Sequence, residues 1–105
     1  RAAGNGNSAA ERRDQKRQEA ERRQQLAIKR KPLEQRIKKL EQRMEKLHAE
    51  KSAIEKALAE PHSYEDANKD RLKEMLLRQG QIGGELEQLE AAWLDLHEEL
   101  EALND

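Results

Sequence analysis

The stretch LEQRIKKLEQRMEKLHAEKSAIEKAL, residues 33–58, decides the fold of this chain. Its apolar side chains recur at alternating spacings of four and three, the heptad pattern with which one helix packs along another. We call the positions of this pattern the seam, and Lys51 is the one polar residue among them. The apolar seam residues of this stretch are Leu33, Ile37, Leu40, Met44, Leu47, Ile54 and Leu58.

The same spacing returns in residues 72–103, where Gln79 is the one polar exception. Although 41% of the chain is charged, a pattern of this length excludes intrinsic disorder for residues 33–103. The apolar seam residues of this second stretch are Leu72, Met75, Ile82, Leu86, Leu89, Trp93, Leu96, Leu100 and Leu103.

The segment EPHSYED, residues 60–66, separates the two patterns. Pro61 ends the first helix, and Ser63 with Asp66 fits the capping pattern that opens a second one. A short connection forces neighbouring helices to run in opposite directions. We therefore predict an all-α fold, a two-helix antiparallel coiled-coil hairpin over residues 32–105 with its turn near residues 60–66.

Three details of this hairpin stay open. Trp93 pairs with Leu33 if the turn is tight, or with Leu40 if the register slips by one heptad. Pro32 either breaks the first helix or kinks it. Three glycines of the second helix are either tolerated surface residues or mark a bend or hinge, namely Gly80, Gly83 and Gly84.

The N-terminal residues precede the seam. Residues 1–8 are small, polar and glycine-bearing, and we interpret them as a flexible linker from an upstream domain absent from this chain. Ser8 and Glu11 fit a capping box, so we expect a helix from about Ala9. Residues 9–31 then form a basic N-terminal helical extension of the hairpin.

Charge is divided unequally along the chain. Residues 1–58 hold 17 Lys and Arg against 9 acids, and residues 59–105 hold 4 against 13. Folding the hairpin lays the acidic residues 85–101 beside the basic residues 22–43. Flanking pairs across the seam would favour this orientation, each contributing about 0.2–1 kcal/mol.

Most catalytic and membrane functions lack a signal in this sequence. There is no Cys, no phosphate-binding glycine motif, and no apolar run near the roughly 20 residues that span a bilayer. None of the three histidines, His48, His62 and His97, has a second His or Cys three or four residues later, and one His with one carboxylate gives too few ligands, so we expect solvated histidines and no metal site. We expect a soluble, cytoplasmic, monomeric hairpin that is not an enzyme and does not contact a membrane.

The helix opening PLEQRIKKL, the turn EPHSYED and the ending LEQLEAAWLDLHEELE resemble the C-terminal domain of ABC-F ATPases, the translation-associated ABC proteins. The likeness covers roughly residues 10–103. It implies a non-catalytic module whose parent protein binds ATP and Mg in upstream domains, with no cofactor in this chain. It also implies contact with DNA or ribosomal RNA, with the ribosome and with the parent's own ATPase domains.

The basic residues before and beside the seam are our candidate nucleic-acid ligands, because phosphate binding needs dense Lys and Arg. Two readings stay open: a tether that binds nucleic acid non-specifically, or a structural coiled coil for protein interaction or self-association. If the basic stretch is instead only a solvated helix, Glu11, Asp14, Glu19 and Glu21 supply internal pairs for it. The candidate residues are Arg12, Arg13, Lys16, Arg17, Arg22 and Arg23, and, shared with the acidic helix, Lys29, Arg30, Lys31, Arg36, Lys38 and Lys39.

Overall fold

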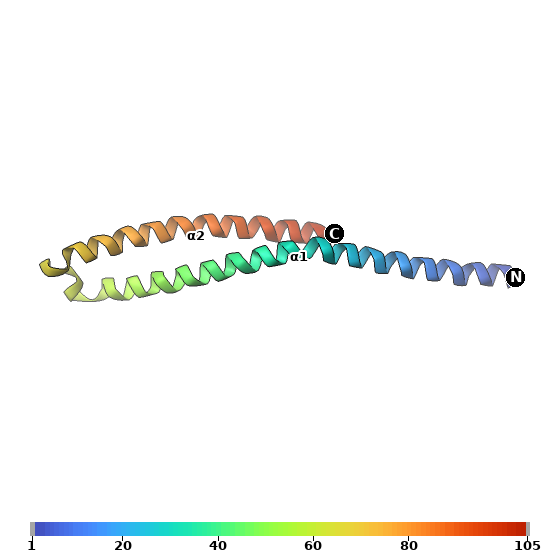
Figure 1. Ribbon diagram of the computed structural model, residues 1–105, viewed down its shortest axis with the longest axis horizontal. Coiled ribbons are helices and arrows are strands. Elements are labelled where there is room, and N and C mark those ends of the chain that lie inside the picture. The colour runs from blue at the N-terminus through green and yellow to red at the C-terminus, as the bar shows by residue number, and fades with distance from the viewer. Residues whose placement is uncertain (1, 105) are drawn as a thin grey trace.

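The computed structural model describes the backbone of residues 2–104 and the side chains of residues 8–104. Its elements are the long helix α1 (Ala2–Ala59), two single 3-10 turns, η1 (Pro61–Tyr64) and η2 (Asp66–Asn68), and helix α2 (Lys69–Asn104). The two helices run side by side in opposite directions (Figure 1). The predicted all-α helical hairpin is confirmed.

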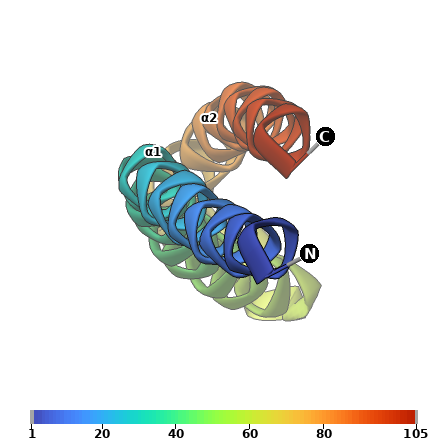
Figure 2. The same ribbon diagram turned by 90° about the vertical axis from the view of Figure 1, so that its right-hand side faces the viewer.

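The hairpin is a rod with one arm longer than the other. It measures 95 × 17 × 15 Å, and the 58 residues of α1 account for about 87 Å of that length. Helix α2 has 36 residues, so the N-terminal part of α1 projects alone past the end of α2 (Figure 1). Figure 2 shows the rod from the end that holds the N-terminus. We call this projecting part, residues 2–25, the stalk.

The core is a single line of side chains between α1 and α2. Leu47 and Ile82 are 1% and 0% exposed, and Leu86 completes a buried cluster against which Met44, Ile54 and Leu89 pack. Ile37 forms a separate buried point nearer the stalk. In a two-helix hairpin the partner helix covers each seam residue on one side only, so the other apolar seam residues are half-buried. These are Leu33, Leu40, Met44, Ile54, Leu58, Leu72, Met75, Leu89, Trp93, Leu96, Leu100 and Leu103.

The register is the one that brings Leu40 to Trp93. The Trp93 Nε1 donates to Glu41 Oε1 at 3.4 Å, and Leu40 shares an open groove with Ala92 and Leu96. The pairing of Leu33 with Trp93 requires a tighter turn than the chain forms. Because residues 61–68 form two successive 3-10 turns, α2 begins only at Lys69. Each residue of α2 therefore lies beside a residue of α1 that is closer to the turn than a tight turn would place it.

The turn is closed by side chains that donate to carbonyls at the end of α1. Ser63 is buried, and its Oγ donates to the Ala57 carbonyl at 2.7 Å, while Tyr64 Oη donates to the Leu58 carbonyl at 2.7 Å. Asn68 Nδ2 donates to the His62 carbonyl at 2.9 Å. The prediction that Ser63 caps the start of α2 was therefore wrong, since its hydroxyl donates to the Ala57 carbonyl at the end of α1, which also accepts from the Glu60 N–H.

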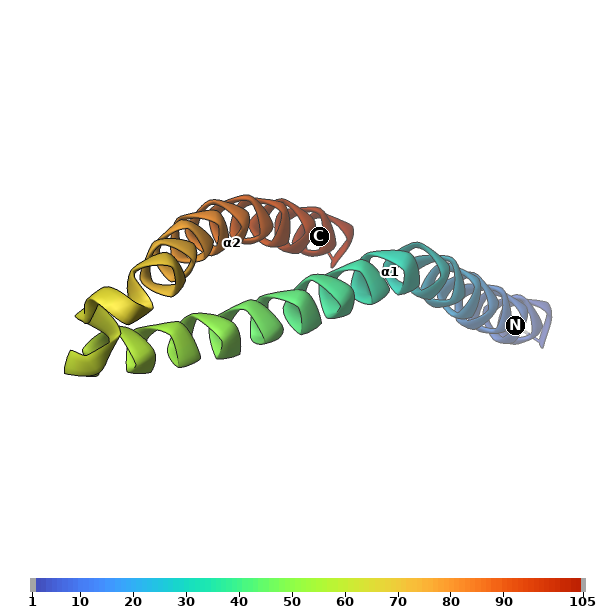
Figure 3. The same cartoon turned by 60° about the vertical axis from the view of Figure 1, so that its left-hand side comes forward.

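Two predictions about α1 also change. The helix begins at Ala2 rather than near Ala9, because adding a residue to an existing helix costs far less than nucleating one and alanines flank the two glycines. Pro32 lies inside α1, so the predicted break is absent and the kink is the surviving alternative. Figure 3 shows α1 changing direction in its teal segment, which holds residues near 30. The linker role of residues 1–8 stays a prediction.

Replacing Leu47 with Ala should cost about 2–5 kcal/mol of unfolding free energy, because it opens a cavity at one of the two most deeply buried positions. Thermal unfolding followed by circular dichroism measures the loss. The control is Ile28→Ala, at a side chain that is 66% exposed, with an expected change within about 0.5 kcal/mol. Equal effects of the two substitutions would show that the seam does not hold the hairpin together.

The glycines of α2 satisfy no backbone requirement of the hairpin. None of the described glycines has a positive φ, and a Cβ placed on Gly80, Gly83 or Gly84 meets nothing within 4 Å. All three lie on the exposed side of a continuous helix. For the hairpin itself, they are tolerated surface residues.

Replacing Gly83 with Ala should raise the unfolding free energy by up to about 1 kcal/mol, because Ala loses less backbone entropy in a helix. Chemical denaturation of the dilute chain measures this gain. A loss of stability would show that the backbone at Gly83 needs a conformation that only glycine adopts without strain.

Candidate nucleic-acid interface

The stalk exposes all six of its candidate basic residues, Arg12, Arg13, Lys16, Arg17, Arg22 and Arg23. They belong to one helix with no second helix beside it. Two of the guanidinium groups lie back along the helix: Arg12 Nε donates to the Ser8 carbonyl and Arg23 Nε to the Glu19 carbonyl, each at 3.4 Å. Their remaining N–H groups are left for solvent or a ligand.

The acids between these basic residues do not neutralise them by direct contact. Among the described side chains, ion pairs begin at Arg30, and no pair contains Glu11, Asp14, Glu19 or Glu21. The internal ion pairs expected of a merely solvated helix are therefore not formed. At residues 8–25 the stalk presents cations without an ion-pair partner among the described side chains.

The basic residues follow the line along which a partner helix would lie. Continuing the seam spacing toward the N-terminus from Arg30 gives Leu26, Arg23, Glu19, Lys16 and Arg12. A helix packed on this line would bury three cations and one acid, which is costly without matched partners. The stalk therefore suits an anionic, solvent-accessible ligand better than a third helix.

The second set of candidate residues lies where α2 runs beside α1. Lys29, Lys31, Arg36, Lys38 and Lys39 are exposed, and no ion pair joins any of these five to α2 in the described part of the chain. Arg30 is half-buried, and its Nε lies 3.5 Å from Glu34 on its own helix. We expected these cations to be shared with the acidic helix, and this was wrong in one respect: no direct ion pair joins them to α2 in the described part of the chain.

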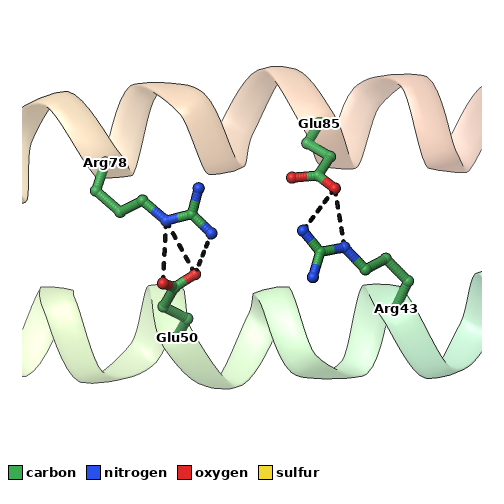
Figure 4. Close-up of polar contacts among 4 residues, drawn as sticks. All are labelled: Arg43, Glu50, Arg78 and Glu85. Atoms are coloured by element: carbon green, nitrogen blue, oxygen red, sulfur yellow. Dashed lines mark hydrogen bonds and ion pairs between the residues drawn. The ribbon is translucent and has the colours of Figure 1, made fainter.

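The ion pairs that do cross the seam lie nearer the turn. Arg78 donates three hydrogen bonds to the Glu50 carboxylate at 2.6–3.1 Å, and Arg43 approaches Glu85 at 2.8–2.9 Å (Figure 4). One pair has its cation on α2 and the other on α1. Together they fix the antiparallel register, because a slip of one heptad would separate both pairs.

The Glu50 pair changes how its members titrate. Hydrogen bonds from Arg78 hold the pKa of the Glu50 carboxyl below its ordinary value, and the same contact raises the pKa of Arg78. A carboxyl pKa that is lower in the folded chain stabilises folding above the unfolded value. This stabilisation is lost as the pH falls through the lowered value.

Replacing Glu50 with Gln should lower the unfolding midpoint by a few degrees at pH 7, and the difference from the parent chain should shrink as the pH falls below the ordinary carboxyl pKa. Unfolding scans between about pH 7 and pH 3 measure it. The matched control is Glu90→Gln, since Glu90 is exposed and has no ion-pair partner among the described residues. Parallel pH profiles for the two variants would contradict this role of Glu50.

Sequence reasoning did not single out these four charged residues, although a signal was present. Each directly precedes a seam position: Arg43 before Met44, Glu50 before Lys51, Arg78 before Gln79 and Glu85 before Leu86. With the register known, this shared position brings the two pairs together. The pairs also flank Lys51 and Gln79, the two polar residues of the seam, which are half-buried.

The histidines divide into two kinds. His48 and His62 are exposed, as expected. His97 was expected in solvent but is half-buried beside Trp93, with ring centroids 4.2 Å apart and its Nε2 shielded without a hydrogen-bond partner. Trp93 packs in the seam rather than offering an open stacking surface.

Among the described residues, no group of three or more His, Asp or Glu lies close enough to hold a metal ion. None of the described helices combines the length and the apolar character that a membrane crossing requires.

The geometry defines a class of protein: a long helical hairpin whose two helices are joined by two 3-10 turns. The family model of the ABC transporter C-terminal domain matches residues 29–98, from just before Pro32 in α1 to near the end of α2. The chain belongs to this family, as a C-terminal module of an ABC protein. No curated protein and no solved structure matches it.

Proposed function

We propose that this chain is the non-catalytic C-terminal module of an ABC-F ATPase and binds nucleic acid through phosphate contacts made by the stalk. The observation that carries the proposal is the state of the six basic residues at positions 12–23. They are exposed, form no ion pair with a described side chain and lie beyond the acidic part of α2. Family membership supports the module, and the charge supports the ligand.

The position of the acidic residues supports a ligand confined to the stalk. The register set by Trp93 and Glu41 brings the end of α2 level with residues 26–31 of α1. Eight acids and no Lys or Arg occupy residues 85–105, so the cations of α1 that lie beside α2 are offset by nearby negative charge, whereas those of the stalk are not.

The chemistry of the stalk fits phosphates rather than bases. Residues 8–25 contain no aromatic side chain on which a base could stack. Arg and Lys on a single helix contact the backbone of DNA or structured RNA without reading sequence. The stalk would tether the ATPase to ribosomal RNA or DNA while the rigid hairpin sets the distance.

Replacing Arg12, Lys16, Arg17 and Arg23 with Gln should abolish most binding to a labelled DNA duplex or a structured RNA. Fluorescence anisotropy at about 50 and 200 mM salt measures it. The parent chain should bind far more weakly at the higher salt, because each phosphate contact releases counterions. Each lost contact should reduce the slope of log affinity against log salt by about 1.

The matched control replaces Lys46, Lys56, Lys69 and Arg71 with Gln. These four residues lie on the hairpin, are exposed, carry the same total charge and form no ion pair in the part of the chain that the structure describes. The control should keep most of the affinity. Equal losses in the two variants would show that net charge rather than the stalk governs binding, and affinity that ignores salt would contradict phosphate binding altogether.

A further inference from the structure

One face of α2, which runs from the flank of the seam to the side opposite it, is unpartnered in the described chain and weakly charged, and we call it the outer face. Leu76 and Leu77 are 51% and 66% exposed, although both are large apolar side chains in a chain that is 41% charged. Successive helical residues are about 100° apart, which brings Leu77 to the side of α2 opposite the seam and Leu76 to the flank beside it. The outer face also contains Lys73, Gly80, Gly83, Gly84 and Glu87.

The exposed leucines and the glycines are both unfavourable for an isolated hairpin. Each glycine costs up to about 1 kcal/mol of helix stability relative to alanine, and no contact or backbone angle in the described chain requires it. Exposed leucines leave apolar surface in water. A close-packed partner on this face would account for both.

The spacing on this face is self-complementary. Taking Gly80 as the centre, Leu76 and Leu77 lie four and three residues before it, and Gly83 and Gly84 lie three and four residues after it. Lys73 lies seven residues before the centre and Glu87 seven after it. In an antiparallel pair with a two-fold axis at Gly80, the leucines of each copy meet the glycines of the other, and each lysine meets a glutamate.

We propose that the outer face of α2 binds a second copy of this chain, forming an antiparallel two-fold dimer centred on Gly80. The inference departs from the monomer expected from the sequence, and it does not rest on nucleic-acid binding. We infer that the partner is a second copy because, across the two-fold axis, leucines face glycines and Lys73 faces Glu87. Both charged residues are exposed and have no ion pair in the described hairpin.

The proposed contact is closed and small. A two-fold interface uses the same surface on both copies, so it stops at two chains. Seven residues a side are far fewer than the roughly 20–30 of a standard stable interface, which makes the dimer weak and concentration-dependent. Because the two α2 helices are antiparallel, the two stalks point toward opposite ends of the dimer.

Sedimentation equilibrium of the 105-residue chain over a wide concentration range tests the proposal through charge reversal. Lys73→Glu and Glu87→Lys should each weaken self-association by about tenfold or more, since each brings like charges together twice. The double variant should restore it. Residues 73 and 87 are about 21 Å apart along one helix, so they can compensate directly only between copies.

Gly84→Leu distinguishes the loss of the dimer from the loss of the fold. It fills the space that the partner's leucine needs, so it should abolish self-association, while the higher helix propensity of leucine keeps or raises the unfolding midpoint. A sample that unfolds would instead be replaced by Gly84→Ala, with a smaller expected loss of association. Dimerisation that survives Gly84→Leu in a folded chain overturns the proposed surface.

Crosslinking gives a second readout, since the chain has no native cysteine. Gly80→Cys lies at the two-fold axis and should form a covalent dimer on mild oxidation. Ala49→Cys, on the exposed outer side of α1, is the control and should form far less. A chain that stays monomeric at every concentration, or equal crosslinking of the two variants, overturns the proposal and leaves the nucleic-acid experiment unaffected.

Discussion

The seam between α1 and α2 is the interaction on which the rest of the structure depends, and it ends where α2 ends. Its buried cluster, Leu47, Ile82 and Leu86, lies within a line of half-buried side chains that holds the two helices together. Because α1 has 58 residues and α2 has 36, the seam cannot cover the whole of α1. The unequal lengths create both a rigid hairpin and a bare stalk.

Charge is arranged around this difference in length. The two ion pairs that cross the seam, Glu50 with Arg78 and Arg43 with Glu85, lie toward the turn and fix the register. Toward the open end the acids of α2 and the cations of α1 run side by side without direct pairs. Past the end of α2, the seam line itself becomes basic at Arg12, Lys16 and Arg23.

Much of the fold could be predicted from the sequence, because heptad spacing is a direct consequence of helix packing. The seam residues and the position of the turn follow from periodicity and from Pro61. The register could not be predicted, because it depends on the length of the 3-10 turn, and Ser63, Tyr64 and Asn68 close that turn through carbonyls that no motif identifies. The candidate basic residues could be named from the sequence. That they form no ion pairs among the described residues could be seen only from the positions of the side chains.

The distance between the end of α2 and the start of the covered part of α1 tests this account most directly. Spin labels at Ala27 and Ala102, both exposed, would report it by pulsed electron resonance. The account predicts a short, narrow distribution, because packed helices lie about 8–10 Å apart between axes, and a label at Ala10 should lie about 25 Å further from Ala102. A long or broad distribution between Ala27 and Ala102 in the folded chain would contradict it.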